Sequence, residues 1–429
     1  MKRKTIFITI GIAILVLVSI LLYLINSNTH FINFNIDSEQ IASNNENFSD
    51  ADLSTFSEQT LIVPERFKEG TFSEERKLNL PEGFEISVYA SGLNAARHFD
   101  FDLNNNMYVT DRKGGRLLFL PDDDGDRVAD KVEVTDDDLT NPHGIDIFDG
   151  DLYLAEEHQV VVYRSINQDG TYFKKEVLIS DLPSGSGHST RTIRIGPNEK
   201  IYLTVGSSCN VCEEKDNRRA AMLEFDLDGS NQRIYAEGLR NTVDFTFANR
   251  KVDGTFEIWS VDNGRDLIGD DIPSEEVNVI EAGEHYGWPF CYGKGIVNPE
   301  YEGKQNDFCK NESVYPLYEM QAHSAPLGLS FIPLGGDMQE FSFPTVLQDN
   351  LFIAFHGSWN RTVPTGYKVV RIDTSVDDPQ VVDFVTGWLG ENGQSWGRPV
   401  GISFDANGDM FISDDKAGAV YKVSYNNNQ

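Results

Sequence analysis

Three loop-like segments carry side chains that could act on a small molecule. His188 lies in SGSGHST, between small residues that leave an imidazole accessible and able to titrate near neutral pH. Arg240 and Asn241 adjoin in GLRNTVDF, where a guanidinium can face a carboxylate and an amide can both donate and accept. Arg398 lies in SWGRPVGI. A surface histidine or arginine would explain each segment alone, so the prediction of a site depends on their combination.

A fourth segment, Gly-rich and acidic, offers oxygen ligands for a cation. Its sequence, NGRDLIGDDIPSEEVNVIEAGEHYGWPF, contains Gly264, Arg265, Glu276 and Tyr286. Hard cations such as Ca²⁺ bind carboxylates and backbone carbonyls on a bent chain. A solvated acidic loop is the alternative interpretation.

A separate acidic motif, DDDGDRVAD (Asp122–Asp130), places Asp122, Asp124, Asp126 and Asp130 around a glycine. This spacing resembles a short calcium loop. An acidic turn between strands explains it almost as well, and both interpretations stay open.

Six short segments of similar pattern must provide the scaffold for these loops. Each combines a turn rich in Asn, Asp or Gly with an apolar run, and the aromatic positions are Tyr108, Tyr153, Tyr202, Trp259, Phe352 and Phe411. The segments recur every 45 to 93 residues. Such repeats, with several strands each, are typical of a β-propeller. We therefore expect an all-β, six-bladed propeller with its chemistry in the axial funnel and an insertion in the longest gap.

The first 75 residues differ from the rest of the chain. Lys2-Arg3-Lys4 precedes an apolar run from Thr5 to Ile25, long enough to span a bilayer. No small-residue cleavage site follows, so we expect an uncleaved signal anchor over residues 1–26, with a cleaved signal peptide as the alternative. Residues 27–75 are predicted to be a flexible linker, and residues 76–426 the propeller.

Charge and cysteine content limit the partners and the compartment. The 429-residue chain has a net charge of −32, which argues against nucleic acid and against adhesion to an anionic membrane surface. An exported body would pair its four cysteines, most simply as Cys209–Cys212 and Cys291–Cys309. A zinc or redox site at CNVC is the rival interpretation, but no second CxxC is present.

Together these segments resemble the glucose/sorbosone dehydrogenase family, the soluble pyrroloquinoline quinone (PQQ) dehydrogenases built on a six-bladed propeller. The resemblance covers roughly Leu80 to Val423. Its most specific part runs from Gly238 to Pro289, where Arg-Asn, Asn-Gly, Glu-Val-Asn and Tyr-Gly-Trp-Pro follow in the family's order. The SGHST, SSCNVC and AHSAPLGL stretches look closer to the sorbosone branch than to the glucose branch.

The resemblance implies roles for individual residues. His188 matches the family's general base, which takes the proton of the sugar C1 hydroxyl. Arg240 matches the arginine beside the quinone C5 oxygen, and Asn241 matches its cofactor-binding neighbour. Arg398 matches an arginine that pairs with a PQQ carboxylate.

For metals, the resemblance implies two Ca²⁺ sites. Gly264 and Arg265 match the two backbone carbonyls that hold the catalytic ion, which polarises the quinone. Glu276 and Tyr286 match ligands of a separate structural ion.

The chain also departs from the family pattern. Arg265 stands where the family usually has proline, and Gly187 replaces an acidic neighbour of the base. His143, in NPHGID, stands where a glutamine commonly contacts the cofactor. No residue matches the cofactor-binding lysine cleanly, and HGSWNR offers His356 and Arg361 instead.

The leading hypothesis is a membrane-anchored quinoprotein dehydrogenase outside the cytoplasm that oxidises an aldose or a sugar aldehyde such as sorbosone. It would use PQQ and Ca²⁺ and pass electrons to a quinone or redox protein, since no CxxCH haem motif is present. A propeller binding or receptor module without cofactor is the alternative. A lactonase-type calcium propeller is a weaker third, because no axial cage of Asn, Asp and Glu ligands is apparent.

Overall fold

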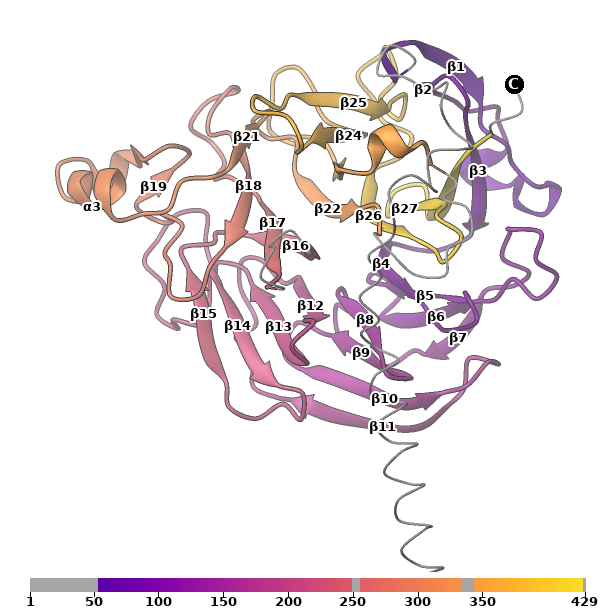
Figure 1. Cartoon of the computed structure of the whole chain (residues 1–429), viewed down its shortest axis with the longest axis horizontal. Coiled ribbons are helices and arrows are strands. Elements are labelled where there is room, and N and C mark those ends of the chain that lie inside the picture. Colours follow the sequence, from indigo (N-terminus) through magenta and orange to yellow (C-terminus); the bar gives the residue numbers. More distant parts are fainter. Residues whose placement is uncertain (1–52, 249–254, 334–342, 427–429) are drawn as a thin grey trace, which may run out of the picture. The chain divides into compact units, whose positions relative to one another are not determined.

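The computed structural model describes residues 53–248, 255–333 and 343–426. Six four-stranded antiparallel sheets, the blades, surround a common axis (Figure 1). Blade 1 contains β4 (Ala96–Phe101), β5 (Met107–Asp111), β6 (Arg116–Leu120) and β7 (Glu133–Asp136). Blade 2 contains β8 (Ile145–Phe148), β9 (Asp151–Ala155), β10 (Val160–Ile166) and β11 (Tyr172–Ile179). Blade 3 contains β12 (Arg191–Ile195), β13 (Lys200–Val205), β14 (Ala221–Asp226) and β15 (Arg233–Glu237).

Blades 4 to 6 follow the same order, from an inner strand outward. Blade 4 contains β16 (Thr242–Ala248), β17 (Glu257–Asp262), β18 (Glu275–Ile280) and β21 (Tyr318–Met320). Blade 5 contains β22 (Pro326–Phe331), β23 (Asn350–Phe355), β24 (Lys368–Asp373) and β25 (Val381–Val385). Blade 6 contains β26 (Pro399–Phe404), β27 (Met410–Asp414), β28 (Ala419–Tyr425) and β3 (Phe84–Ser91). The pairing of β28 with β3, from Ala419↔Ser91 to Tyr425↔Phe84, joins the two ends of the propeller and closes the ring. The expected six-bladed propeller is confirmed.

Each of the six sequence repeats forms the second strand of a different blade. Its aromatic residue is buried, and each of the six lies in a different hydrophobic cluster, in the order Tyr108, Tyr153, Tyr202, Trp259, Phe352 and Phe411. Each cluster contains residues of two successive blades; Tyr108 of blade 1, for example, shares its cluster with Leu152 of blade 2. Burying such a ring contributes about 1.5–3 kcal/mol. The repeat therefore specifies the blade–blade interface as well as the blade.

The structured body begins earlier than the boundary at residue 76 that composition predicts. β1 (Phe56–Thr60) pairs with β2 (Lys77–Pro81), and two short 3₁₀ segments, η2 (Glu65–Phe67) and η3 (Gly70–Phe72), lie between them. Leu53, Leu61 and Phe72 are buried in the largest hydrophobic cluster. These three apolar residues are isolated within a segment rich in polar residues, so composition alone predicts a linker for residues 53–75.

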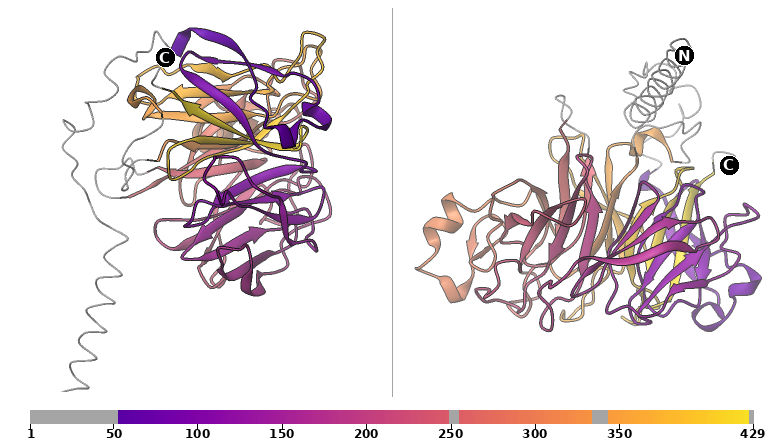
Figure 2. Two further views of the ribbon diagram at one scale, coloured as in Figure 1. Left: turned by 90° about the vertical axis from the view of Figure 1, so that its right-hand side faces the viewer. Right: turned by 90° about the horizontal axis from the view of Figure 1, so that it is seen from below.

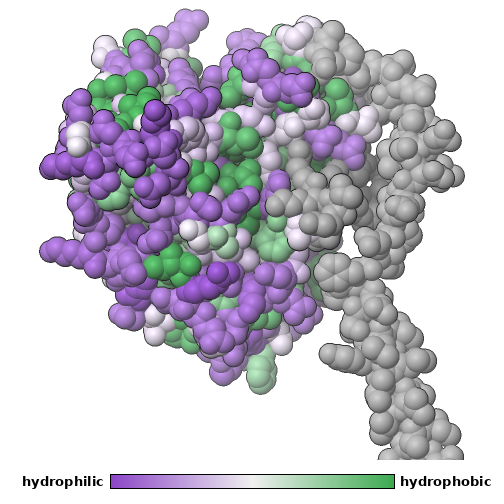
Figure 3. All heavy atoms as spheres, turned by 60° about the vertical axis from the view of Figure 1, so that its left-hand side comes forward, coloured by the Kyte–Doolittle hydropathy of each residue, from purple (hydrophilic) through white to green (hydrophobic). Residues whose placement is uncertain are grey.

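The predicted signal anchor, residues 1–26, lies outside the described residues. Among the residues that the structure does describe, no helix is both long and apolar enough to cross a membrane. The face in Figure 3 is mostly hydrophilic with scattered apolar patches, in keeping with the net charge of −32.

The longest gap between repeats holds the expected insertion, between β18 and β21. It contains β19 (Cys291–Tyr292), β20 (Ile296–Val297), η4 (Pro299–Tyr301) and α3 (Asn306–Asn311), and it projects from the edge of blade 4 (Figures 1 and 2). The Cys291–Cys309 disulfide closes it, as predicted. One more 3₁₀ segment, η5 (Thr345–Leu347), precedes β23.

Strand alternation decides where the functional loops meet. Because neighbouring strands of a blade are antiparallel, the chain returns to the same end after every second strand. The loop entering each inner strand and the loop joining the second and third strands therefore lie at one end of every blade, which we call the site face. The Asp122–Asp130 loop joins β6 to β7, the third and fourth strands of blade 1, and so lies on the opposite face.

Candidate functional site

His188 enters β12 on the site face and is held by Ser207 of the β13–β14 loop. The His188 backbone N–H donates to the Ser207 carbonyl at 2.9 Å, and Nδ1 lies 3.1 Å from that carbonyl and 2.9 Å from Ser207 Oγ. The Ser207 hydroxyl donates its own hydrogen to the Cys209 carbonyl at 2.8 Å. Both Ser207 oxygens therefore accept from the ring, so Nδ1 carries the proton and Nε2 keeps its lone pair.

The surroundings of His188 keep its imidazole neutral. Burial first, and the positive charge of Arg240 second, lower the pKa of His188 to about 3. A neutral ring with a free Nε2 lone pair can accept a proton. An anion bound nearby would raise this pKa toward the range that suits a general base.

Arg240 enters β16, and every N–H of its guanidinium has a protein acceptor. Nε donates to the Asn210 carbonyl at 3.1 Å, and Nη2 donates to Asn210 Oδ1 at 2.9 Å and Asp266 at 3.3 Å. Nη1 donates to the carbonyls of Asn263 at 3.0 Å and Gly264 at 2.8 Å. The guanidinium is thus fixed between the β13–β14 and β17–β18 loops, and its position is preset before any ligand binds.

Asn241 places an unsatisfied amide oxygen beside His188. Asp262, the last residue of β17, accepts the Asn241 backbone N–H at 2.9 Å and the Thr242 hydroxyl at 2.8 Å, which fixes the entry into β16. Asn241 is 7% exposed, and its Oδ1 is buried with no hydrogen-bond partner in the described part of the chain. A Cβ at Gly206 would lie 2.7 Å from this Oδ1 and 2.7 Å from His188 Cβ, so the two side chains approach over a glycine.

The β17–β18 loop brings the Gly264 carbonyl to the same place, 2.8 Å from Arg240 Nη1. The Gly264 N–H donates to the Glu275 carboxylate at 2.7 Å, which fixes the loop to the first residue of β18. The Arg265 guanidinium instead pairs with Glu300 of the insertion, at 2.6 and 3.0 Å. Replacing the family's proline with Arg265 therefore ties this loop to the insertion, and the role of its carbonyl as a metal ligand stays a prediction.

Two glutamates begin β18, of which Glu275 is buried and Glu276 is half-buried. Burial raises the pKa of Glu275 and of Glu276 to about 8 each. Glu276 accepts the Gly293 N–H at 2.8 Å, and the Tyr286 hydroxyl donates to the Val279 carbonyl at 2.7 Å. Because the hydroxyl of Tyr286 is engaged inside blade 4, Tyr286 would have to coordinate a metal through its backbone carbonyl. The structural Ca²⁺ site at Glu276 and Tyr286 stays a prediction.

A cavity of about 640 Å³ opens on the site face near the start of β26 and β4. Five of its lining residues carry a positive charge, and Asp415 alone carries a negative one. An acidic protein thus has a cationic cavity on its site face, which is suited to an anionic ligand. The lining residues are Asn94, Ala95, Arg97, Arg112, Lys113, Asn141, His356, Tyr367, Ser395, Arg398, Asp415 and Lys416.

Arg398 lies in this cavity, as the resemblance implies for a carboxylate-binding arginine. Its backbone N–H donates to Asp414 at 2.9 Å, its Nε to the His356 carbonyl at 3.0 Å and its Nη2 to the Gly357 carbonyl. The guanidinium carbon is 5.4 Å from the ring centroid of Tyr367. These contacts fix the direction of the charge.

Reasoning from the sequence missed an ion network in the same cavity. Asp415 accepts from Arg97 Nη1 and from His356 Nε2, each at 2.8 Å. Burial alone would raise the pKa of Asp415, but His356 and Arg97 outweigh it and hold that pKa below its usual range. Arg112 joins this region to the loop that carries His188 by donating to Ser189.

A sequence signal for these residues existed. Arg112, His356 and Asp415 each follow directly the last residue of the second strand of their blade, and so does Asn263. Positions at a constant offset from a repeat lie at equivalent places around a propeller axis. Reading one position beyond each repeat finds Arg112 and Asp415, whereas His356 is already a candidate through HGSWNR.

His143 lies deeper than a cofactor contact would. It is fully buried, its Nδ1 accepts from Arg97 Nε at 3.2 Å, and its Nε2 is 3.5 Å from the Val243 carbonyl. Its ring packs on His98, with 4.2 Å between centroids. Burial lowers the pKa of His143 well below its ordinary value. Both ring nitrogens face the protein, so His143 supports Arg97, and the prediction that it contacts the cofactor finds no support here.

Arg361 lies on the β23–β24 loop and not in the cavity lining. Its Nη2 donates to Asp271 at 2.9 Å and its Nη1 to the Ala322 carbonyl at 3.3 Å. Next to it, Asn360 donates to Asp266 at 2.9 Å. Arg361 therefore ties two loops of the site face together, while His356 is the HGSWNR residue that reaches the cavity.

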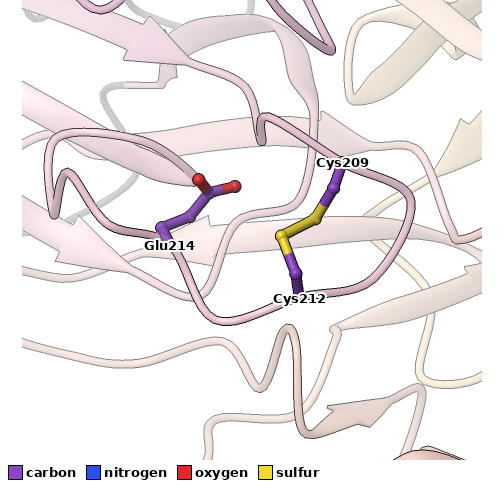
Figure 4. A group of neighbouring side chains, drawn as sticks. All are labelled: Cys209, Cys212 and Glu214. Atoms are coloured by element: carbon purple, nitrogen blue, oxygen red, sulfur yellow. A yellow bond between two sulfur atoms is a disulfide. The ribbon is translucent and has the colours of Figure 1, made fainter.

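In the described part of the chain, two further groups of side chains offer potential metal ligands. The ligand atoms of Asp122, Asp124 and Asp130 lie within 4.8 Å of one another on the opposite face, without Asp126. Cys209, Cys212 and Glu214 form the second group, but Figure 4 shows the two sulfurs joined in a disulfide. That disulfide confirms the predicted pairing and excludes thiolate coordination in this state.

Comparison with known proteins agrees with the six-bladed fold. A family model described as TrAA12-like matches residues 78–426. An uncharacterized protein of Borreliella burgdorferi is 31% identical over 365 residues, which cover 81% of this chain and 91% of that protein.

Two better-characterised proteins are also similar. The pyrroloquinoline quinone-dependent pyranose dehydrogenase of Coprinopsis cinerea is 25% identical over 424 residues; the match covers 81% of this chain and 54% of that enzyme, so the chain spans about half of its length. A calcium structure of the family AA12 enzyme of Trichoderma reesei superposes with a TM-score of 0.68 at 22% identity, covering 81% of this chain and 96% of that one.

Proposed function

This chain belongs to the TrAA12-like family, and on that premise we propose that it is a PQQ-dependent sugar dehydrogenase. The proposed substrate is an aldose or a related sugar aldehyde. The observation that carries the proposal is the cationic cavity on the same face as a neutral His188, a preset Arg240 and the unsatisfied oxygen of Asn241.

The residues of the site face fit PQQ. PQQ is a tricarboxylate, and the cavity offers Arg97, Arg112 and Arg398 as guanidinium partners for carboxylates. The buried Oδ1 of Asn241 lacks a partner that a bound ligand could supply. We therefore expect Arg398 and Asn241 to hold the cofactor, with Arg97 and Arg112 as additional cationic ligands.

The Gly264 carbonyl suits a Ca²⁺ ligand. It already accepts one hydrogen bond from Arg240, and a carbonyl oxygen has a second lone pair. Ca²⁺ prefers such oxygen ligands, and a bent loop with Gly264 and Arg265 offers two carbonyls in succession. The calcium structure of the Trichoderma reesei relative supports a calcium requirement in this chain.

The proposed reaction needs a base and a charge stabiliser from the protein. His188 Nε2 accepts the proton of the sugar hydroxyl as the adjacent C–H bond gives up its hydride, while Ser207 holds the imidazolium that forms. Arg240 provides fixed positive charge where negative charge develops. When bound, PQQ supplies the two-electron acceptor and Ca²⁺ increases its electrophilicity.

Reconstitution tests this proposal directly. The purified protein is incubated with PQQ and Ca²⁺, and its quinone absorbance is followed as pyranoses and sugar aldehydes are added. We expect stoichiometric PQQ uptake and a change in absorbance with at least one sugar. No uptake would favour the cofactor-free binding module, and uptake without any sugar response would overturn sugar oxidation as the function.

We also propose that the propeller works outside the cytoplasm, attached to a membrane through residues 1–26. All four cysteines of the chain are in disulfides, which fits an oxidising compartment. Its electron acceptor is then a quinone or redox protein outside the cytoplasm. Fractionation of cells with and without residues 1–26 tests the anchor: we expect the full chain in the membrane fraction and the shortened chain in the soluble one.

A further inference from the structure

Asn210 accepts two hydrogen bonds from the guanidinium of Arg240, whereas Asn263, Gly264 and Asp266 accept one each. Its carbonyl accepts from Arg240 Nε at 3.1 Å, and its Oδ1 accepts from Nη2 at 2.9 Å. The same Oδ1 accepts the Asp266 N–H at 2.8 Å, and Nδ2 donates to the Asp266 carbonyl at 3.0 Å. Asn210 thus binds Nε and Nη2 of the guanidinium, and through Asp266 it also fixes the β17–β18 loop that carries Gly264.

The loop that presents Asn210 also holds the imidazole. Ser207, three residues before Asn210, contacts His188 through its carbonyl and its hydroxyl. The hydroxyl donates onward to the carbonyl of Cys209, the residue that adjoins Asn210. The orientation of His188 and that of Arg240 therefore depend on one short segment, residues 207–210.

A covalent bond closes this segment. The Cys209–Cys212 disulfide makes a ring of four residues that includes Asn210 (Figure 4). The ring is braced further by Glu214, which accepts the Ser208 N–H and hydroxyl, each at 2.6 Å. Such a ring restricts the backbone dihedrals of Asn210, whose carbonyl and side chain must both point at Arg240.

We propose that Asn210 is a positioning residue for Arg240, and that the Cys209–Cys212 disulfide holds Asn210 in the orientation this role requires. The inference rests on the proposed function, since it names what aligns the charge stabiliser for sugar oxidation. Misplacing a group of this kind by about 1 Å costs about 10²-fold in rate.

The test compares three variants of the full chain loaded with PQQ and Ca²⁺. Asn210→Ala removes the side-chain acceptor, and the double variant Cys209→Ser/Cys212→Ser opens the ring. Val211→Ala changes the same ring at a residue without a role in the argument and serves as the control. For the first two we expect kcat to fall by about 10²-fold with the sugar KM little changed, and for the control we expect wild-type values.

A second measurement does not depend on activity. Burial lowers the pKa of His188 most, and the charge of Arg240 lowers it further, with smaller contributions from Arg191 and Arg219. The hydrogen bond to the Ser207 carbonyl raises this pKa. If Asn210→Ala lets Arg240 move away, the pKa of His188 rises, and NMR titration of the cofactor-free protein detects this. The acid limb of kcat/KM should shift to higher pH in the same direction.

The outcomes separate the two proposals. A wild-type protein that oxidises no sugar, together with a raised pKa of His188 in Asn210→Ala, would overturn the proposed function and support the role of Asn210. An active wild-type protein, together with wild-type kcat and an unchanged pKa of His188 in Asn210→Ala, would overturn the positioning role alone. Loss of rate in Cys209→Ser/Cys212→Ser but not in Val211→Ala would support the part given to the disulfide, and wild-type kcat in the double variant would overturn it.

Discussion

Ser207 binds the ring of His188 through two oxygen atoms, and both of them act as acceptors. The Ser207 hydroxyl hydrogen goes to the Cys209 carbonyl, so Nδ1 of His188 must donate and Nε2 is left basic. A hydrogen-bond network thus selects the tautomer that proton abstraction requires. The residue type alone does not specify this.

Replacing His188 with glutamine should lower sugar turnover by about 10²–10⁴-fold, the usual effect of losing a general base. PQQ affinity should change little, because His188 has no place among the cationic cavity residues. Steady-state kinetics and PQQ titration check both parts. His158, a partly buried histidine of the β9–β10 loop, provides the control as His158→Gln. A His188→Gln enzyme with near-normal turnover would remove His188 from the mechanism.

Replacing Arg398 with glutamine should weaken PQQ binding by about 10- to 100-fold, since a hydrogen bond to a charged group contributes about 1.5–3 kcal/mol. Arg398→Lys should restore only part of the affinity, because lysine cannot reproduce the planar fork. Calorimetric titration with PQQ measures this. Arg233→Gln, which breaks an exposed ion pair with Glu224 on blade 3, should bind PQQ like the wild type.

Stripping Ca²⁺ with a chelator should lower PQQ affinity, sugar oxidation and the melting temperature together. A cation beside an anionic cofactor offsets its charge, and an ion that binds only the folded protein stabilises it by mass action. Adding back Ca²⁺ should restore all three. PQQ affinity that is the same with and without Ca²⁺ would contradict the proposed role of the Gly264–Arg265 carbonyls. Glu276→Gln should lower the melting temperature more than the turnover of the protein that remains folded.

Stability should depend on pH through His188. Its folded pKa of about 3 lies below the ordinary value of 6.5, so the unfolded chain binds more protons between these values. The contribution of His188 to the free energy of unfolding is therefore fully present above about pH 6.5, and it is lost progressively as the pH falls. From pH 7 to pH 5 the wild type should lose about 2 kcal/mol more unfolding free energy than His188→Gln. Urea unfolding of both proteins at the two pH values gives this difference, and parallel losses would contradict the low pKa.

Opening the insertion should affect stability and spare the site. Removing a disulfide that closes a loop of 18 residues costs about 3 kcal/mol in the chain-entropy model. Cys291→Ser/Cys309→Ser should therefore lower the melting temperature, while its PQQ affinity stays near the wild-type value. A large loss of PQQ affinity would show that the insertion shapes the site through the Arg265–Glu300 contact.

The scaffold of this protein was largely predictable because its signal is local and repeated. Six apolar runs with an aromatic residue mark the second strand of every blade, and each ring then fills one blade–blade interface. Pairing cysteines with their nearest partners along the chain was also enough to identify both disulfides. Composition places the beginning of the body too late, at residue 76, because Leu53, Leu61 and Phe72 are isolated apolar residues that form no periodic pattern.

The site was predictable only in part. His188, Arg240, Asn241 and Arg398 could be chosen from short segments, since each lies at the entry to an inner strand. The packing of the blades around the axis decided the rest. It brings Arg97 against Asp415 across 318 residues, it places His143 beneath Arg97 instead of in the cavity, and it brings Asn210 to Arg240 across 30 residues.

The sequence by itself determined the strands and the chemical types on their loops, because periodic burial and turn chemistry act over a few residues. Only the tertiary structure decided which of those side chains meet, because that depends on the order of blades around an axis that no local segment contains.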